Sequence, residues 1–504
     1  MPERAGVSPS DPVAVIDIGS NSGRVMVFER DASSHLRLLA GSRAPLRLVH
    51  DVDTRKQLSE ATMARTMEAL RDFQAIAAGA GAKRIVAVAT AAMRDATNGA
   101  RFVERVRREL GLRIDIIEGL AEARYGFAGA VRGLAVSNGL LFDLGGGSLQ
   151  ITRFARRRLV EAVSLPFGAL RLSEKFLHSD PPSGKQLRRL RDHVRSRLAK
   201  ARVVRLTSGD RLVGAGGTLR NLAKIDRQTR RYPIRSLHAY ELSVDRLGDV
   251  VDRLTSTKKK RRDEIPGLSA DRADSIVGGA VVVQALAEFA RATRILVSGQ
   301  GVREGVALGL LRMVIGSSDS VKEASLSSLV SRFDGWRQET AARRRTVAAA
   351  LQRALEPRAP AGVAVAIDHA ARVLDIGRSL DVVNRHEHVA DVLLSTDLTG
   401  FAHDDLALVS AIVRRAGDRH ADVRWLVPGR ATVKPGLVER AAIIVALADE
   451  IEARCPVGRP IVVDCQIGRA VIVSVEPLPS WLGKDLDKRF ERAFGRPLIV
   501  RYES

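Results

Sequence analysis

Two stretches of this sequence share one pattern: VAVIDIGSNS at residues 13–22 and GLLFDLGGGS at residues 139–148. In both, an apolar run that predicts a buried strand ends in Asp-x-Gly-x-x-Ser, and a second strand-like run follows. Such a hairpin presents a carboxylate, that of Asp17 or Asp143, beside backbone N–H groups of the turn. The N–H groups can hold phosphate oxygens, and the carboxylate can hold a metal ion that neutralises them. The repeated pattern therefore predicts a duplicated domain that grips phosphate in the cleft between its halves.

The composition is that of a chain with ordinary buried cores. At 504 residues, with 45% hydrophobic and 28% charged residues, it should form about three domains. No run approaches the roughly 18 apolar residues of a membrane span, so we expect no membrane partner. The polar start, Met1 to Pro12, lacks the apolar core of a signal peptide and is predicted to be a frayed tail. The cysteines, Cys455 and Cys465, are too few for a disulfide framework, which favours a cytoplasmic location.

The net charge of +23 means that the surface attracts polyanions. Nucleic acid, anionic lipid and inorganic polyphosphate all have the required charge. Aromatic residues are only 4% of the chain, which leaves few platforms for stacking bases and makes nucleic acid the less favoured partner. A general preference of the source proteome for arginine would also explain the charge.

The apolar runs divide the chain into four parts. Residues 13–130 and 131–315 each begin with three predicted strands and continue with alternating strands and helices. In the second part, a strand runs into a glycine loop and a helix at 211–218 and again at 294–301, which suits ligand binding at carboxyl ends of strands. A long helix is expected at Ala270 to Ala290. After the boundary signal at 316–320, a mostly helical part follows at 324–420, and a small α+β part closes the chain at 421–504.

Seven short motifs follow one another between about residues 13 and 311. They are Val15 to Ser22, Ala89 to Ala96, Glu122 to Arg124, Asp143 to Ser148, Gly214 to Thr218, Arg272 to Asp274 and Val302 to Gly305. In this order they resemble the exopolyphosphatase/guanosine pentaphosphate phosphohydrolase family, Ppx/GppA. The resemblance implies an α/β fold with a duplicated ribonuclease-H-like core of two lobes, as in actin, sugar kinases and heat-shock chaperones. It also implies that a phosphate chain binds in the cleft between the lobes.

The resemblance also implies roles for individual residues. Asp17 and Asp143 would hold Mg²⁺ directly or through water, and Glu122 would take a proton from the water that attacks phosphorus. The phosphate-binding residues would be Ser20, Asn21, Ser22, Arg94, Gly145, Gly146, Gly147, Ser148, Gly216, Gly217 and Thr218. Each role has a structural alternative, because an Asp can cap its own turn, a glycine can serve a tight turn and a helix Glu can be solvated.

Two positions depart from the family pattern. Ala121 stands before Glu122 where the family has a second Glu, and Gln150 stands where the family has a Glu after Gly-Gly-Gly-Ser. Gln keeps the shape and the hydrogen bonds of Glu but loses its charge. Weaker metal binding or poorer orientation of water is the expected result. In the last motif, Arg303 and Glu304 are expected to form an ion pair that braces the loop.

The helical part resembles the HD-like domain of long family members. Leu374-Asp375-Ile376-Gly377 stands where HD phosphohydrolases have His-Asp-Ile-Gly, and four histidines occur nearby: His369, His386, His388 and His403. A working HD site needs His and Asp ligands together. Because Leu374 replaces the histidine, we expect no second active site, and we expect the histidines to pack or to form hydrogen bonds.

The leading function is Mg²⁺-dependent release of terminal orthophosphate from inorganic polyphosphate. Two alternatives stay open. Hydrolysis of the 5′ γ-phosphate of guanosine pentaphosphate needs the same terminal-phosphate site, and Gln150 leaves room for a non-catalytic sensor of polyphosphate or nucleotide. Basic stretches such as 156–158, 188–191 and 258–262 are either solvated faces or a track for a long anion. A homodimer is also left open.

Overall fold

The computed structural model describes residues 11–418, 420–423, 434–481 and 483–502. The chain divides into two compact units. Unit 1 comprises Met1–Tyr232 and Leu237–Ser325, and unit 2 comprises Pro233–Ser236 and Leu326–Ser504. Residues 1–10 of the tail predicted at Met1 to Pro12 lie outside the described residues. None of the helices in the described ranges is long and apolar enough to cross a membrane.

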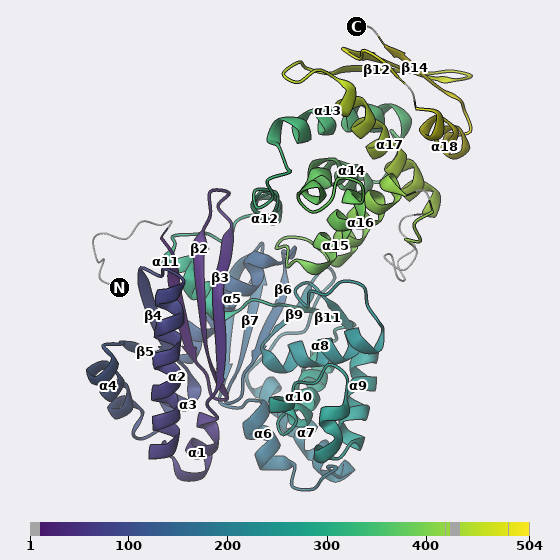
Figure 1. The fold of residues 1–504 in the computed structure, drawn as a ribbon. Coiled ribbons are helices and arrows are strands. Elements are labelled where there is room, and N and C mark those ends of the chain that lie inside the picture. Colours follow the sequence, from purple (N-terminus) through teal and green to yellow (C-terminus); the bar gives the residue numbers. More distant parts are fainter. Residues whose placement is uncertain (1–10, 419, 424–433, 482, 503–504) are drawn as a thin grey trace. The chain divides into compact units, whose positions relative to one another are not determined.

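Unit 1 begins with a five-stranded sheet in the order β3-β2-β1-β4-β5 (Figure 1). The strands are β1 (Val13–Ile18), β2 (Ser22–Arg30), β3 (Leu36–Pro45), β4 (Arg84–Ala89) and β5 (Ile114–Ile116). β4 runs parallel to β1 and to β5, while β2 is antiparallel to β1 and β3. Successive side chains of a strand point to opposite faces, and along β1 both sets are buried. Helices therefore have to cover this sheet on both sides.

The second sheet of unit 1 repeats this plan. Its order is β10-β11-β9-β6-β7-β8, so β6, β7, β8, β9 and β11 take the places of β1 to β5, and β10 is an addition at the edge. The strands are β6 (Gly139–Leu144), β7 (Leu149–Ala155), β8 (Arg158–Leu165), β9 (Arg211–Ala215), β10 (Glu241–Ser243) and β11 (Arg294–Val297). The duplicated two-lobed fold predicted from the repeated pattern is confirmed.

Helices cover one face of each sheet in sequence order. Those of the first lobe are α1 (Leu48–Arg55), α2 (Glu60–Gly79), α3 (Ala91–Asp95) and α4 (Gly99–Leu110). Those of the second are α6 (Ala169–Phe176), α7 (Gly184–Lys200), α8 (Gly217–Thr229), α9 (Val244–Ser256) and α10 (Ile276–Phe289). Ser59 caps α2 by accepting from the Thr62 N–H, and Met63, Met67 and Leu70 on one side of that helix enter the core.

The opposite faces are covered by two helices that the lobes exchange. α5 (Gly119–Gly133) comes from the first half of unit 1, yet its Phe127 packs with Leu141 of the second sheet. α11 (Val302–Leu310) comes from the end of unit 1, yet its Val306 packs with Val15 of the first sheet. The predicted lobe boundaries at 130/131 and 315 therefore assign most of α5 and all of α11 to lobes whose sheets these helices do not cover. They follow sequence order, whereas burial of the apolar face of α11 requires the first sheet.

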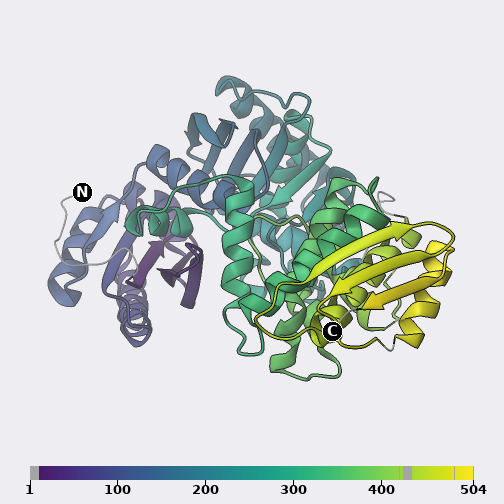
Figure 2. The ribbon, with the colours of Figure 1, turned by 90° about the horizontal axis from the view of Figure 1, so that it is seen from above.

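Unit 2 is a set of helices followed by a small sheet. The helices are α13 (Gln338–Leu355), α14 (Ala361–Val373), α15 (Arg385–Ser395), α16 (His403–Gly417) and α17 (Pro435–Arg454), while α12 (Ser318–Val330) spans the boundary between the units. The sheet has the order β12-β13-β14, formed by β12 (Val462–Ile467), β13 (Val471–Glu476) and β14 (Leu498–Tyr502), with α18 (Lys484–Phe494) before the last strand. Figure 2 shows its three strands side by side in yellow.

A buried ion cluster in unit 2 contains the Asp of the HD-like motif. The guanidinium of fully buried Arg344 contacts Asp375 at 2.6 Å and Asp449 at 2.8 Å. His369 packs its ring against Phe401, with centroids 5.3 Å apart, and burial lowers the pKa of His386 to about 4. Asp375 therefore has a guanidinium partner, and the HD-like assignment stays a prediction.

Candidate active site

The two Asp-Gly hairpins fold in the same way down to single hydrogen bonds. In the first, the Gly19 N–H donates to the Ser22 carbonyl at 3.1 Å. In the second, the Gly145 N–H donates to the Ser148 carbonyl at 3.0 Å. The carbonyls at the tip of each turn accept from the helix that follows the sheet's third strand, namely α1 or α6. Backbone hydrogen bonds thus hold one side of each turn, and its other side faces the other hairpin.

The tips of the two hairpins approach each other closely. A Cβ added at Gly147 would lie 2.8 Å from the Ser20 hydroxyl oxygen, and one added at Gly146 would lie 3.4 Å from the Ser20 Cβ. Glycine at these two positions therefore lets the second hairpin reach the first. Between and beside the hairpins lies a cavity of about 120 Å³.

Most of the predicted site residues line this cavity. They are Asp17, Ser20, Asn21, Ser22, Glu122, Asp143, Gly145, Gly146, Ser148, Gly216 and Gly217. Gly216 has a φ of 96°, and its added Cβ would lie 2.6 Å from the Leu144 carbonyl oxygen, so this position requires glycine for backbone reasons. Gly217 would place a Cβ 2.5 Å from the Arg272 guanidinium.

Four predicted residues lie beside the cavity and do not line it. Arg94 donates from Nη1 to the Ile117 carbonyl at 2.7 Å, just before α5 begins. Thr218 turns its methyl group toward Gly279 of α10. Gly147 abuts Ser20, and Gln150 lies behind Ser148, to which it donates at 3.0 Å. The structure therefore gives these residues supporting contacts around the cavity.

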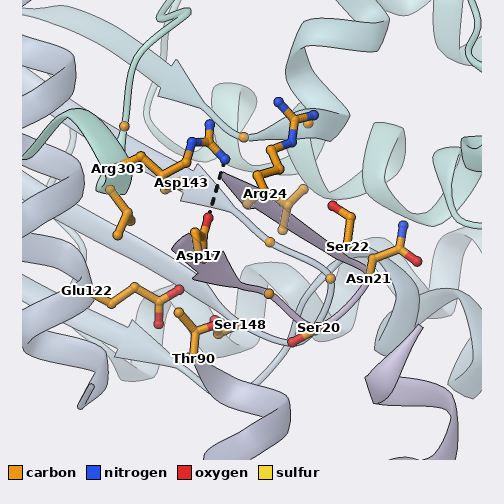
Figure 3. A pocket seen from close by; sticks show the side chains of 18 of the residues that line it. Asp17, Ser20, Asn21, Ser22, Arg24, Thr90, Glu122, Asp143, Ser148 and Arg303 are labelled. Atoms are coloured by element: carbon orange, nitrogen blue, oxygen red, sulfur yellow. Dashed lines mark hydrogen bonds and ion pairs between the residues drawn. The ribbon is translucent and has the colours of Figure 1, made fainter. Parts of the chain in front are cut away.

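Three carboxyl groups meet at the cavity, as Figure 3 shows for Asp17, Asp143 and Glu122. Burial, together with the nearby charges of Asp143 and Asp17, raises the pKa of Glu122 to about 8, while Arg94 opposes the shift. Burial also raises the pKa of Asp17 and of Asp143, and the charge of Asp17 adds to the rise at Asp143. No described group donates a hydrogen bond to Glu122 Oε2, which is buried.

The cavity also has basic and polar lining that the sequence analysis did not assign. These residues are Arg24, Thr90, Arg220, Arg272, Gln300 and Arg303. Burial lowers the pKa of Arg24 to about 9 and that of Arg220 to about 10, and the neighbouring charge of Arg303 adds to both shifts. Guanidinium groups held this close to one another, out of water, are stabilised by an anion. Arg24 could have been found from the hairpin, because it stands directly opposite Asp17 across the two strands.

The expected ion pair between Arg303 and Glu304 is wrong. Adjacent residues of a helix do not face each other. Arg303 instead contacts Asp17 through Nη1 at 3.3 Å, the dashed line of Figure 3. Glu304 accepts from the Gly301 N–H at 2.7 Å and so closes the first turn of α11. Arg303 belongs to the cavity, and Glu304 belongs to the helix end.

The carboxylates suit a hydrated magnesium ion. Mg²⁺ is usually bound through one or two carboxylates, with water and substrate phosphates as its other ligands. Asp17 and Asp143 are two half-buried carboxylates whose raised pKa values would fall again beside a cation. Within the described ranges, no group of three or more His, Cys, Asp or Glu side chains is placed so that it could hold a metal ion.

A second cavity, of about 420 Å³, adjoins the first at Asn21. Its lining mixes basic groups such as Arg47 and Lys259 with apolar side chains such as Leu177 and Val277. Arg262, from the predicted basic stretch 258–262, also lines it but is buried in an ion pair with Asp180 at 3.1 Å. The space next to the hairpins is therefore larger than a single phosphate.

Known proteins resemble the part of the chain that forms this site. The Ppx/GppA phosphatase family matches residues 26–313 of the 504, more than half of the chain. Exopolyphosphatase 2 of Mycobacterium tuberculosis is 32% identical over 313 residues, which are 59% of this chain and 98% of that protein. Exopolyphosphatase 1 of Mycobacterium leprae is 30% identical over 304 residues, which are 59% of this chain and 88% of that protein. The crystal structure of the Aquifex aeolicus member of the Ppx/GppA family has 28% identity and a TM-score of 0.53, and covers 60% of this chain and 98% of its own. On this match and this shared fold, the chain belongs to the Ppx/GppA phosphatase family.

Proposed function

We propose that this chain is a Mg²⁺-dependent exopolyphosphatase that releases terminal orthophosphate from inorganic polyphosphate. The observation that carries the proposal is the Glu122 carboxyl, which is buried in a cavity between two phosphate-type hairpins and whose Oε2 has no described hydrogen-bond partner. A buried polar atom without a partner calls for a water molecule or a ligand. Relatives that match this part of the chain are named exopolyphosphatases.

In the proposed reaction, the second hairpin binds the terminal phosphate. The turn N–H groups of Gly146 and Gly147 and the Ser148 hydroxyl donate to its oxygens. Ser20 and Asn21 contact it from the first hairpin. Arg24, Arg220 and Arg272 add positive charge where the transition state spreads negative charge over the phosphoryl oxygens.

Glu122 is the proposed general base. It holds a water molecule, takes its proton as the water oxygen attacks phosphorus, and the P–O bond to the rest of the chain breaks. The shortened polyphosphate leaves as an oxyanion. Mg²⁺, held by Asp17 and Asp143, would supply charge neutralisation at the phosphate oxygens. The pKa of about 8 is that of the cavity without a cation, and a cation beside Asp17 and Asp143 would lower it, so that Glu122 enters the step as a carboxylate.

A second candidate is hydrolysis of the 5′ γ-phosphate of guanosine pentaphosphate. The observation that favours it is the adjoining cavity of about 420 Å³, whose partly apolar lining suits a nucleoside as well as phosphate. The terminal-phosphate chemistry would be the same in both reactions.

The test measures phosphate release from long-chain polyphosphate, tripolyphosphate and guanosine pentaphosphate side by side, with Mg²⁺ and with a chelator. Release from polyphosphate that ends on chelation supports the leading proposal. A kcat/KM that is higher for guanosine pentaphosphate would favour the second candidate. Binding of polyphosphate without release from any substrate would favour the sensor that Gln150 leaves open.

A further inference from the structure

Gln150 lies in a row of three polar residues across the second sheet. On β7 it stands directly opposite Asp143 of β6 on one side and Ser164 of β8 on the other. Residues directly opposite each other in antiparallel strands share a face, with Cβ atoms about 5 Å apart. The Gln150 side chain is 3% exposed and therefore has to use protein partners.

The amide nitrogen of Gln150 donates to two hydroxyl groups. Nε2 lies 3.0 Å from the Ser148 Oγ and 3.3 Å from the Ser164 Oγ. Each of its N–H bonds thus has an acceptor, and the Ser148 oxygen, itself in the cavity lining, accepts one of them. A hydroxyl that already accepts on one side is left with its own proton to donate on the other.

We infer that Gln150 is a positioning residue that directs the Ser148 proton into the cavity, as a donor to an anionic phosphate oxygen. The inference rests on the proposed function, since it gives the site a phosphate to bind. It assigns a purpose to the residue at which this chain departs from the family pattern. Here the amide is a donor, whereas a carboxylate can only accept.

A Glu at position 150 would have two effects on the site. It would accept from Ser148 and so turn the hydroxyl proton away from the incoming anion. It would also place a like charge directly opposite Asp143, where three carboxyl groups already gather. Both effects weaken anion binding, so the neutral amide is the better partner for Ser148 in this cavity.

The same amide supports the helix that carries Glu122. The Ser164 hydroxyl, held by Gln150, lies against the start of α5, where a Cβ added at Gly119 would be 2.3 Å from its oxygen. Glu122 stands three residues further along α5. Gln150 thereby links the group that binds phosphate to the helix of the proposed base.

The test uses sulfate as the probe, because sulfate resembles phosphate in shape and charge. The dissociation constant is measured by calorimetry for the full chain, for Gln150→Glu and for Gln150→Met. Gln150→Glu should weaken sulfate binding roughly tenfold, since a hydrogen bond to a charged partner is lost.

Ser148→Ala supplies the matched control. Gln150→Met should weaken sulfate binding about threefold in the wild-type background and have no effect when Ser148 is already Ala. Unchanged sulfate binding in Gln150→Glu, or an effect of Gln150→Met that persists in Ser148→Ala, would overturn the inference. These measurements need no turnover. A wild-type chain that binds sulfate but releases no phosphate would therefore contradict the proposed function and leave the result on Gln150 standing.

Discussion

Glu122 combines a pKa of about 8 with a buried oxygen, Oε2, that has no described partner. We expect Glu122→Gln to lower kcat for polyphosphate by about 10² to 10⁴, the usual cost of losing a general base, because the amide cannot accept the proton of water. Polyphosphate should still bind, since the hairpins and arginines are unchanged. The matched control is Glu118→Gln, an exposed carboxylate one helical turn away, which should keep wild-type turnover. Full activity in Glu122→Gln would assign the base elsewhere.

The raised pKa of Glu122 also affects stability. The folded chain holds the Glu122 proton up to about pH 8, whereas the unfolded chain releases it near the ordinary value of 4.5. The folded state therefore loses stability as the pH rises from about 4.5 to about 8. Glu122→Gln removes this loss. Without divalent cations, its Tm should equal that of the wild type near pH 4.5 and exceed it by a few degrees at pH 8, on the order expected for one or two kcal/mol. A constant difference across this range would mean that Glu122 does not titrate as inferred.

Among the residues of the cavity, those in sequence motifs could be predicted from the sequence. Those that reach the cavity only because of the fold could not. Asp17, Asp143 and Ser148 sit in a repeated pattern, so their shared cavity could be predicted. Arg220 could not, because α8 reaches the cavity only through the order of strands in the second sheet. The role of Gln150 as a donor was also hidden, since it depends on the register of β7 with β8.

Among the elements, the junction of β9 and α8 contributes two adjacent glycines, Gly216 and Gly217, to the lining of the cavity. Gly216 has a left-handed backbone and no room for a Cβ, whereas Gly217 faces the flexible end of Arg272. Gly216→Ala should therefore lower the Tm by roughly 5 °C or more, because the strain falls on the backbone.

Gly217→Ala gives the contrasting result. The added methyl meets a guanidinium that can move, so the Tm should change little, while KM for polyphosphate should rise severalfold because Arg272 is displaced. Both variants are compared by thermal unfolding and by steady-state kinetics. Equal effects on Tm would show that the two glycines serve the same purpose.

The extent of α10 shows where pattern reading fails for an element. The apolar run predicted a helix at Ala270 to Ala290, but α10 is Ile276–Phe289, and Ala270–Arg272 form a short 3-10 helix. Asp and Ser residues in 271–275 compete with the helix for backbone hydrogen bonds. This irregular start lets Arg272 turn into the cavity, so the misplaced boundary coincides with a residue of the site.

For the molecule as a whole, the charge of +23 predicts how binding responds to salt. KM for long-chain polyphosphate should rise with ionic strength more steeply than KM for tripolyphosphate, because a longer anion reaches more exposed charges and salt screens each of them. Kinetics at several salt concentrations give the two slopes. Equal slopes would confine binding to the cavity.

Unit 2 is expected to contribute to affinity for long chains. Ending the chain after Ser325 removes unit 2 except for Pro233–Ser236. If the shortened chain remains folded by circular dichroism, its kcat for tripolyphosphate should be kept, and its KM for long-chain polyphosphate should rise. An unchanged KM for long chains would assign unit 2 to assembly.

The duplication within unit 1 could be predicted from the sequence, but the sheet that each connecting helix covers could not. The repeated hairpin marks β1 and β6 as equivalent strands, whereas the order of the other strands comes from the structure. The exchange of α5 and α11 has no local signal, because both helices carry ordinary apolar faces. Which sheet an apolar face covers is decided by the whole fold.

Because α11 covers the first sheet but is made late, one face of that sheet stays uncovered during synthesis on the ribosome. The first sheet emerges early, but the face that carries Val13 and Val15 is covered by α11, whose residues are added only from Val302 onward. At about 5–20 residues per second, that face waits roughly 15 s to 1 min for its cover. A nascent chain of this protein therefore carries an open apolar surface for most of its synthesis. It should depend on chaperones that shield such surfaces until the helix that closes the first lobe has left the exit tunnel.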